Sequence, residues 1–155
     1  MVTLAPTTDQ TTAVKIRKAR SKDAQQLAEL SGQLGYPTTA AEICTRMGKL
    51  RPIGKHAVFV AELKGGGVIG WLHVSVSNLL EADVRGEVNG LVVADGQRSA
   101  GAGAKLLRAA EDWARRQGCK AMNVRSNVIR ERAHCFYERE GYQHYKTQKA
   151  FQKPL

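Results

Sequence analysis

The sequence predicts an α/β (α+β) protein with a mixed, mainly antiparallel central sheet of six or seven strands, flanked by about four helices. Two observations lead to this prediction. β-rich runs in the first half are joined by a glycine run, which is typical of an antiparallel hairpin. The second half changes to the order strand, helix, strand, which is typical of parallel strands joined by a crossover helix.

Residues 1–13 are expected to form a flexible N-terminal tail, because they are rich in Thr and poor in large apolar side chains. Residues 14–155 are expected to form a single domain, long enough to bury a core without disulfides or a metal. No apolar run approaches the roughly 20 residues of a membrane span, and no signal-peptide pattern is visible. We therefore expect a cytoplasmic protein without membrane contact.

The first expected elements are a short strand and two helices. Residues 14–17 alternate apolar and basic side chains, as a half-buried strand does. Ser21 is a suitable cap for a helix whose apolar positions follow at helical spacing. Gly35 and Pro37 interrupt that helix, and a second helix is expected over 39–50.

The clearest hairpin follows these helices. The β-rich runs 56–63 and 68–76 are joined by the letters KGGG, whose glycines accept the positive φ angles of a tight turn. A further β-rich run over 83–93 extends the antiparallel sheet. The sequence therefore predicts at least three adjacent antiparallel strands in the middle of the chain.

The second half of the chain alternates helices and strands. A helix is expected over 101–118 and a strand over 119–127, so the strands on either side of the helix should be parallel. One more helix is expected over 130–142, ended by a glycine. The tail, residues 142–153, is expected to supply the last one or two strands.

The formal net charge of +10 indicates an anionic partner or serves solubility. The basic residues are spread along the chain and aromatic residues are few, so no stacking platform for nucleic acid is visible. A small, highly charged anion such as a nucleotide cofactor fits the charge equally well. We therefore expect no nucleic-acid partner.

The three cysteines are Cys44, Cys119 and Cys135. They are scattered, form no C-x-x-C pair and have no His at ligand spacing, so they predict neither a disulfide framework nor a metal site. We expect reduced thiols that are mostly buried.

The stretch VVADGQRSAGAGAKLL, residues 92–107, leads from a strand into a helix through a turn rich in Gly and Ala, which have little or no side chain. Such a turn is physically an anion site, because unpaired N–H groups and the helix dipole point outward. The dinucleotide fingerprint fails, since Leu106 stands where its third glycine is required. The P-loop pattern also fails, since Ala102 follows Gly101 where lysine is required.

What matches instead is Arg98-x-x-Gly101-x-Gly103, directly after a strand. This stretch resembles the [QR]-x-x-G-x-[GA] signature of the GNAT superfamily of N-acetyltransferases. AHCFYEREGYQ, residues 133–143, is similar to that family's A-x-x-F-Y-x-x-x-G-[FY] helix, and it follows at the appropriate distance. The similarity covers roughly residues 85–153 and implies a GNAT-like acyl-CoA N-acyltransferase fold.

The resemblance implies acetyl-CoA (coenzyme A) as cofactor. Main-chain N–H groups near Leu91 to Val93 are expected to bind the oxyanion where two parallel strands diverge. Those from Arg98 to Ala104 are expected to hold the pyrophosphate. Asn127 either binds the pantetheine or caps the following helix, and we favour the cap. The expected cofactor-binding residues are Leu91, Val92, Val93, Arg98, Ser99, Ala100, Gly101, Ala102, Gly103, Ala104, Asn127 and Tyr137.

Catalysis requires an unprotonated amine, although alkyl ammonium groups have pKa values of roughly 10. The family often uses a carboxylate at the position that Asn89 occupies here, so the chain departs from its pattern. Glu87, on the same face of the strand, either acts as base through water or is a surface carboxylate. By resemblance Tyr137 donates its proton to the leaving sulfur, although spacing alone makes it a core aromatic. The expected catalytic residues are Tyr137, Glu87 and Asn89.

The sequence thus predicts an N-acetyltransferase that moves an acetyl group to a primary amine by direct attack in a ternary complex. The alternative is a non-catalytic acyl-CoA-binding or regulatory module, because Asn89 is no carboxylate. The first two helices and residues 81–87 are expected to form the acceptor pocket, and the carboxylates there either suit a cationic amine or are simply solvated. The acceptor and the oligomeric state stay open, with a homodimer as the commonest closed assembly.

Overall fold

The computed structural model describes residues 13–51 and 54–155, in two compact units, Met1–Val124 and Arg125–Leu155. Among the described residues, the first unit contains one five-stranded sheet and three α-helices, and the second contains one α-helix and the C-terminal tail. Residues 1–12 of the predicted flexible tail lie outside the described residues. The single domain after that tail stays a prediction.

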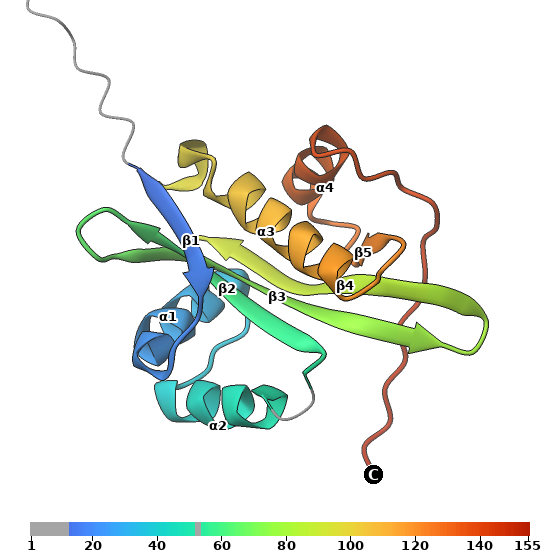
Figure 1. Ribbon diagram of the computed structural model, residues 1–155, viewed down its shortest axis with the longest axis horizontal. Helices are drawn as coiled ribbons and strands as arrows, with labels where there is room; N and C mark the ends of the chain where they lie inside the picture. Colours follow the sequence, from blue (N-terminus) through green and yellow to red (C-terminus); the bar gives the residue numbers. More distant parts are fainter. Residues whose placement is uncertain (1–12, 52–53) are drawn as a thin grey trace, which may run out of the picture. The chain divides into compact units, whose positions relative to one another are not determined.

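The five strands lie side by side in the order of the sequence (Figure 1). They are β1 (Val14–Lys18), β2 (His56–Leu63), β3 (Val68–Leu79), β4 (Ala82–Val93) and β5 (Met122–Val124). The pairs β1–β2, β2–β3 and β3–β4 are antiparallel, whereas β5 pairs with β4 in parallel. The predicted hairpin, the strand that extends it and the parallel pair are therefore confirmed.

The predicted number of six or seven strands is wrong for the described part of the chain. The tail expected to add one or two strands, residues 142–153, forms no strand. Its largest apolar side chains are solvated, with Tyr145 65% and Phe151 91% exposed. The tail therefore buries too little apolar surface to offset the entropy lost on ordering a strand.

The helices are α1 (Ala24–Leu34), α2 (Ala40–Leu50), α3 (Ala102–Arg116) and, in the second unit, α4 (Glu131–Arg139). The predicted start of α2 is confirmed by a capping box in which Thr39 and Glu42 bond each other's backbone N–H groups. The predicted cap at Ser21 is wrong, because Ser21 begins a short 3-10 helix, η1 (Ser21–Asp23). There the Asp23 carboxylate accepts a hydrogen bond from the Arg20 N–H at 2.7 Å.

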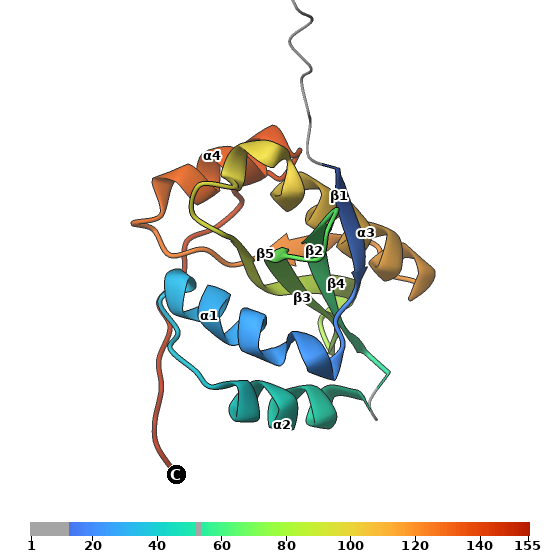
Figure 2. The same ribbon diagram turned by 90° about the vertical axis from the view of Figure 1, so that its left-hand side faces the viewer.

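In the first unit, helices cover both faces of the sheet. Figure 2 shows α1 and α2 on one face and α3 on the other. On the α3 side, Leu72 and Val74 of β3 and Leu106 of α3 are fully buried, and a second apolar layer is buried between α1 and the other face. A Cβ atom built on Gly70 would lie 3.2 Å from Leu106, so the small residue lets α3 approach the sheet.

A charged cluster joins the edge strand β1 to the rest of the sheet. The Arg17 guanidinium donates to both carboxylate oxygens of Asp23, at 2.8 and 2.9 Å, and to Glu62 at 2.6 Å. These hydrogen bonds hold the pKa of both carboxyl groups below their usual range. Because the Asp23 side chain is only 4% exposed, the charge of Arg17 is needed to compensate its burial.

Candidate active site

The glycine-rich turn predicted to bind an anion lies between β4 and α3. A short 3-10 helix, η3 (Arg98–Ala100), leads into Gly101, which has a φ of 73° and stands directly before the first residue of α3. A Cβ atom built on Gly101 would meet nothing within 4 Å among the described residues, so the backbone there is open to approach. The first N–H groups of a helix have no intrahelical partner, so α3 offers several donors to an anion.

Contacts within the first unit hold this turn in place. Arg98 makes an ion pair with Asp95 at 2.8 Å and is half exposed, so its charge lies at the surface of the turn. The Asp95 N–H donates to Oε1 of Gln33, at the end of α1, at 3.1 Å. No sequence pattern predicts this link, because no motif pairs residues so far apart in the chain.

The pairing between β4 and β5 is short, which leaves an open strand edge beside the turn. The two strands pair only over Gly86–Met122, Glu87–Asn123 and Val88–Val124. On the other side of β4, a bulge at Asn89 interrupts the ladder, since His73 pairs with Gly90 and Val74 with Val88. No further pairing with β5 follows within the described part of β4, so the segment after the bulge has one free edge.

Backbone alternation separates the three residues expected to bind the oxyanion. The Ala94 N–H donates to Ile69 of β3 at 2.7 Å, so alternate residues of β4 direct their N–H groups away from β3. By this alternation Leu91 and Val93 turn their N–H groups toward the free edge. Val92 turns its N–H group toward β3, where the ladder uses it.

The predicted pair Glu87 and Asn89 lies on the face of the sheet that carries α1. Residues directly opposite each other in antiparallel strands project from one face, and Glu87 is opposite Ser75. The Asn89 amide donates to the Ser75 hydroxyl at 2.8 Å, so Asn89 shares that face despite the bulge. The Glu87 carboxylate lies 3.3 Å from the guanidinium of Arg85. The structure therefore groups Glu87 and Asn89 around Ser75.

The same face carries three polar side chains that were not among the predicted site residues. His56 Nδ1 and His73 Nε2 lie 3.0 Å apart, and burial together with His56 lowers the pKa of His73 to about 4. The buried Trp71 Nε1 has no hydrogen-bond partner within residues 13–51 and 54–155. The alternation Trp71-x-His73-x-Ser75 was the available signal, because a strand covered on both faces is usually apolar on both.

The second unit contains Tyr137, on α4. Its ring contacts those of Phe136 and Tyr142 edge to face, with centroids 5.2 and 5.8 Å away. Burial raises the pKa of Tyr137 to about 12, although the nearby charge of Arg130 acts in the opposite direction. The phenol is therefore protonated at neutral pH and able to donate a proton.

Asn127, also in the second unit, does not cap α4 as favoured from the sequence. Its side-chain oxygen accepts the N–H of Ile129 at 3.1 Å, in the turn before the helix. The N-cap of α4 is Arg130, whose N–H donates to the Asn127 carbonyl at 3.0 Å. The reason is spacing, since Asn127 stands three residues too early for its side chain to reach the first turn of α4.

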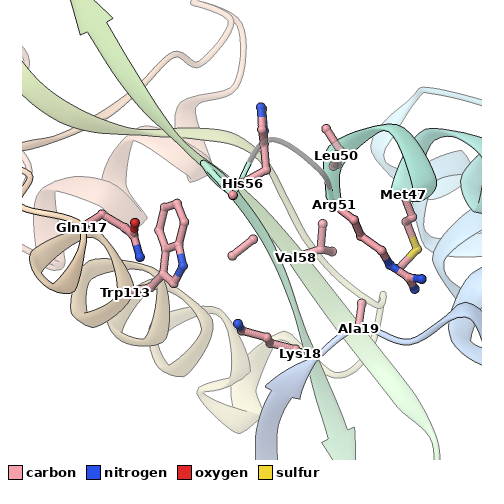
Figure 3. Close-up of a pocket in the computed structure, with 11 residues that line it drawn as sticks. Lys18, Ala19, Met47, Leu50, Arg51, His56, Val58, Trp113 and Gln117 are labelled. Carbon is pink, nitrogen blue, oxygen red and sulfur yellow. The ribbon is translucent and has the colours of Figure 1, made fainter.

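A pocket of about 360 Å³ lies elsewhere in the first unit (Figure 3). Side chains of β1, α2, β2 and α3 surround it, among them Lys18, Arg51, His56 and Trp113. Trp113 is near the C-terminal end of α3, and a helix of 15 residues is roughly 22 Å long. The pocket therefore lies at the opposite end of α3 from the glycine-rich turn.

The expectation of mostly buried cysteines is wrong. Cys44 and Cys135 are exposed, and Cys119 is partly exposed. Small apolar thiols are often buried, but each of these lies on or beside a helix whose inward positions other residues occupy. Among residues 13–51 and 54–155, no group of His, Cys, Asp and Glu has the arrangement of a metal site. No helix in that part of the chain is long and apolar enough to cross a membrane.

The fold and the turn together define a class of protein with a mixed sheet, an open glycine turn at a helix N-terminus and a free strand edge beside it. The family model described as Acetyltransferase (GNAT) domain matches residues 54–144, which is more than half of the chain. The chain belongs to this family. The match begins after α2, so β1, α1 and α2 are outside it.

One curated relative is an aminoalkylphosphonate N-acetyltransferase of Salmonella typhimurium, 36% identical over 91 residues. The match covers 57% of this chain and 59% of the relative, so the chain spans less than two thirds of that protein. Two solved structures show the same fold. Glucosamine-6-phosphate N-acetyltransferase from Arabidopsis thaliana has a TM-score of 0.78 at 23% identity, covering 90% of this chain and 98% of that one. The aminoglycoside N-acetyltransferase AAC(6')-Iy in complex with CoA has a TM-score of 0.81 at 17% identity, covering 98% and 100%.

Proposed function

We propose that the protein is an acetyl-CoA-dependent N-acetyltransferase that acetylates a small primary amine by direct attack in a ternary complex. The observation that carries the proposal is the open glycine turn at the start of α3 beside the free edge of β4. Acetyl-CoA is the acetyl donor of the GNAT family, and a solved structural neighbour contains CoA. The donors of this chain suit such a ligand, because its pyrophosphate is anionic and its pantetheine contains amide groups.

In this proposal each backbone segment has one task. The N–H groups from Arg98 to Ala104 bind the pyrophosphate, and the half-exposed Arg98 adds positive charge. The free edge of β4 pairs with the pantetheine as an added strand would. The N–H groups of Leu91 and Val93 lie on that edge, where one of them stabilises the oxyanion of the tetrahedral intermediate.

Three side chains are proposed to act in catalysis, two of them in proton transfer. Glu87 is proposed to remove the ammonium proton through water, from the face it shares with Asn89. Asn89 is proposed to orient the acceptor, since its amide is fixed by Ser75. Tyr137 is proposed to protonate the leaving thiolate, which its high pKa supports because the phenol then holds its proton at neutral pH.

Three experiments test the function. Isothermal titration calorimetry with acetyl-CoA is expected to show binding at a single site, and absence of heat would contradict the proposal. A thiol-release assay then screens an aminoalkylphosphonate, glucosamine 6-phosphate, an aminoglycoside and a polyamine as acceptors. Binding without turnover on a broad panel would favour a non-catalytic acyl-CoA-binding module, which Asn89 in place of a carboxylate supports. Stabilisation by an oligonucleotide instead of acetyl-CoA in a thermal shift assay would favour a nucleic-acid partner.

A further inference from the structure

We propose that His73 accepts the proton that the acceptor ammonium loses, and that His56 is the positioning residue that holds His73 in the tautomer this requires. The inference rests on the proposed acetyltransferase function and makes His73 the first acceptor of the proton that Glu87 is proposed to remove through water. It starts from the histidine pair that crosses from β2 to β3 on the face of Glu87 and Asn89.

The position of the pair in the sheet supports this role. His73 is directly opposite Gly90 of β4, the residue that follows the bulge at Asn89. The free edge of β4 begins at that bulge. His56 is directly opposite Ser75, which is in turn opposite Glu87, so these three residues form one row across β2, β3 and β4. His73 therefore stands one row from the carboxylate already proposed as base.

The hydrogen bond of the pair leaves one nitrogen of His73 available. His56 Nδ1 and His73 Nε2 are 3.0 Å apart, and the ring centroids are 5.2 Å apart with the planes 31° from each other. In the tautomer that the proposal requires, His73 Nε2–H donates to His56 Nδ1. Nδ1 of His73 then holds a lone pair, and it has no hydrogen bond to any residue in 13–51 or 54–155.

The groups around His73 favour a neutral imidazole. Its pKa is lowered to about 4, by burial first and by His56 second, so it is unprotonated at neutral pH. On β4, Glu87 and Arg85 lie 3.3 Å apart and offset each other. Arg17 of β1 also projects from this face and is paired with Asp23 and Glu62. The cations Lys18 and Arg51 line the pocket that His56 borders. From α1, which packs on β3, the buried side chains Leu27, Leu30 and Ser31 carry no charge. The neutral ring keeps a lone pair at neutral pH, and because burial disfavours the imidazolium, His73 would hold the proton only transiently before passing it on.

A second observation indicates that this face receives a ligand. Trp71 lies two residues before His73 and projects from the same face, and its buried indole N–H lacks a partner among the described residues. Its ring lies over Gly90, where a built Cβ atom would come within 2.7 Å of the indole. Buried donors are rarely left unpaired. A polar atom of the bound amine substrate that accepts a hydrogen bond from this N–H would satisfy it.

The proposed step balances with one proton. The N–H bond of the acceptor ammonium breaks and its electron pair stays on nitrogen, which becomes the nucleophile. Nδ1 of His73 takes the proton, directly or through one water, and becomes an imidazolium that still donates Nε2–H to His56. Transfer of the Nδ1 proton through water to the Glu87 carboxylate, and from there to solvent, restores the neutral pair.

The test compares two acceptors with His73→Gln. The first is the best amine from the acceptor screen, and the second is its analogue with a trifluoromethyl group on the carbon that bears the amino group, whose ammonium pKa lies below neutral. With the first acceptor at pH 7, we expect kcat/KM to fall by roughly 10²-fold or more, as for loss of a general base. With the fluorinated acceptor, which arrives unprotonated, we expect the loss to be less than about threefold.

Controls separate this role from a structural one and from failure of the proposed function. Acetyl-CoA affinity by calorimetry should be unchanged in His73→Gln, and raising the pH from 7 to 9 should restore its activity toward the first acceptor. His56→Gln should show the same pattern with a smaller loss, and it serves as the test variant if His73→Gln does not fold. Equal losses with both acceptors, or no loss with either, would overturn the role of His73. Binding of acetyl-CoA without any turnover by the unaltered protein would overturn the proposed function itself and this role with it.

Discussion

The two faces of β3 differ in chemistry although the same strand forms both. Toward α3, Leu72 and Val74 are fully buried among apolar side chains. Toward α1, His73 and Ser75 bond other polar side chains on β2 and β4. Burial of an apolar side chain contributes about 1.5–3 kcal/mol to folding, whereas a hydrogen bond contributes about 1 kcal/mol net. The α1 face also buries apolar side chains, among them Val60 of β2 and Leu27 of α1, so the comparison indicates that this face combines apolar packing with a polar row that the α3 face lacks.

The largest effect expected concerns the α3 face. Leu106→Ala removes a fully buried side chain from the core, so the free energy of unfolding should fall by about 2–5 kcal/mol. Denaturant unfolding followed by circular dichroism measures this change. Leu80→Ala, at a fully exposed position, is the matched control and should have no effect. An equal loss of stability in both variants would contradict the stabilising role of the buried α3 face.

The next effect concerns the charged cluster at the edge of the sheet. Asp23→Asn removes the charge that pairs with Arg17, and should lower the free energy of unfolding by about 2 kcal/mol at pH 7. Because the folded pKa of Asp23 is lowered, its contribution is present above its unfolded pKa of about 3.9 and is lost as the pH falls through the folded value.

Denaturation curves measured from pH 7 down to pH 2 check this sign. The unaltered protein should lose stability below about pH 4, and the difference from Asp23→Asn should shrink there. A difference that grows as the pH falls would show that the carboxylate is not stabilising.

A smaller effect on stability is expected at the glycine turn. Gly101→Ala forces a side chain into a φ of 73°, which costs about 1 kcal/mol. The added methyl group meets no described atom of the protein, so we expect the main loss in acetyl-CoA affinity, by about tenfold or more. Calorimetry measures the Kd. Gly96→Ala, with a φ of 82° and equally open surroundings, is the matched control and should cost similar stability while keeping the affinity.

The smallest effect on stability is expected on the α1 face. Ser75→Ala removes the hydroxyl that accepts the Asn89 amide, and should change the free energy of unfolding by less than about 1 kcal/mol. We expect a larger relative change in kcat/KM, because Asn89 loses its orientation. Thermal unfolding and the thiol-release assay report the two quantities separately. A stability loss as large as that of Leu106→Ala would remove the distinction between the two faces.

Local patterns predicted the elements that depend on neighbours in the chain. The helix over 39–50, the KGGG hairpin and Gly101 before α3 follow from short-range geometry, and the structure places all three as expected. Predictions that needed distant partners were less successful. Ser21 resembles a cap but begins a 3-10 helix, and the C-terminal tail looks like a strand but buries no apolar side chain.

The candidate site shows the same division. The motif residues around the turn were identifiable, since each follows its neighbour in one short stretch. The histidine pair was not, because His56 and His73 meet only through the register of β2 and β3. The bulge at Asn89 also depends on register, and it decides which N–H groups of β4 reach the free edge.

The sequence by itself determined the family, the helix that begins at a glycine turn and the strand order of the hairpin, because these depend on residue types a few positions apart. Only the tertiary structure decided that Arg17 compensates Asp23, that the pairing of β5 stops at Val88, and that His56 contacts His73. The physical reason is that burial and strand register are set by all the packed elements together, and no local pattern contains that information.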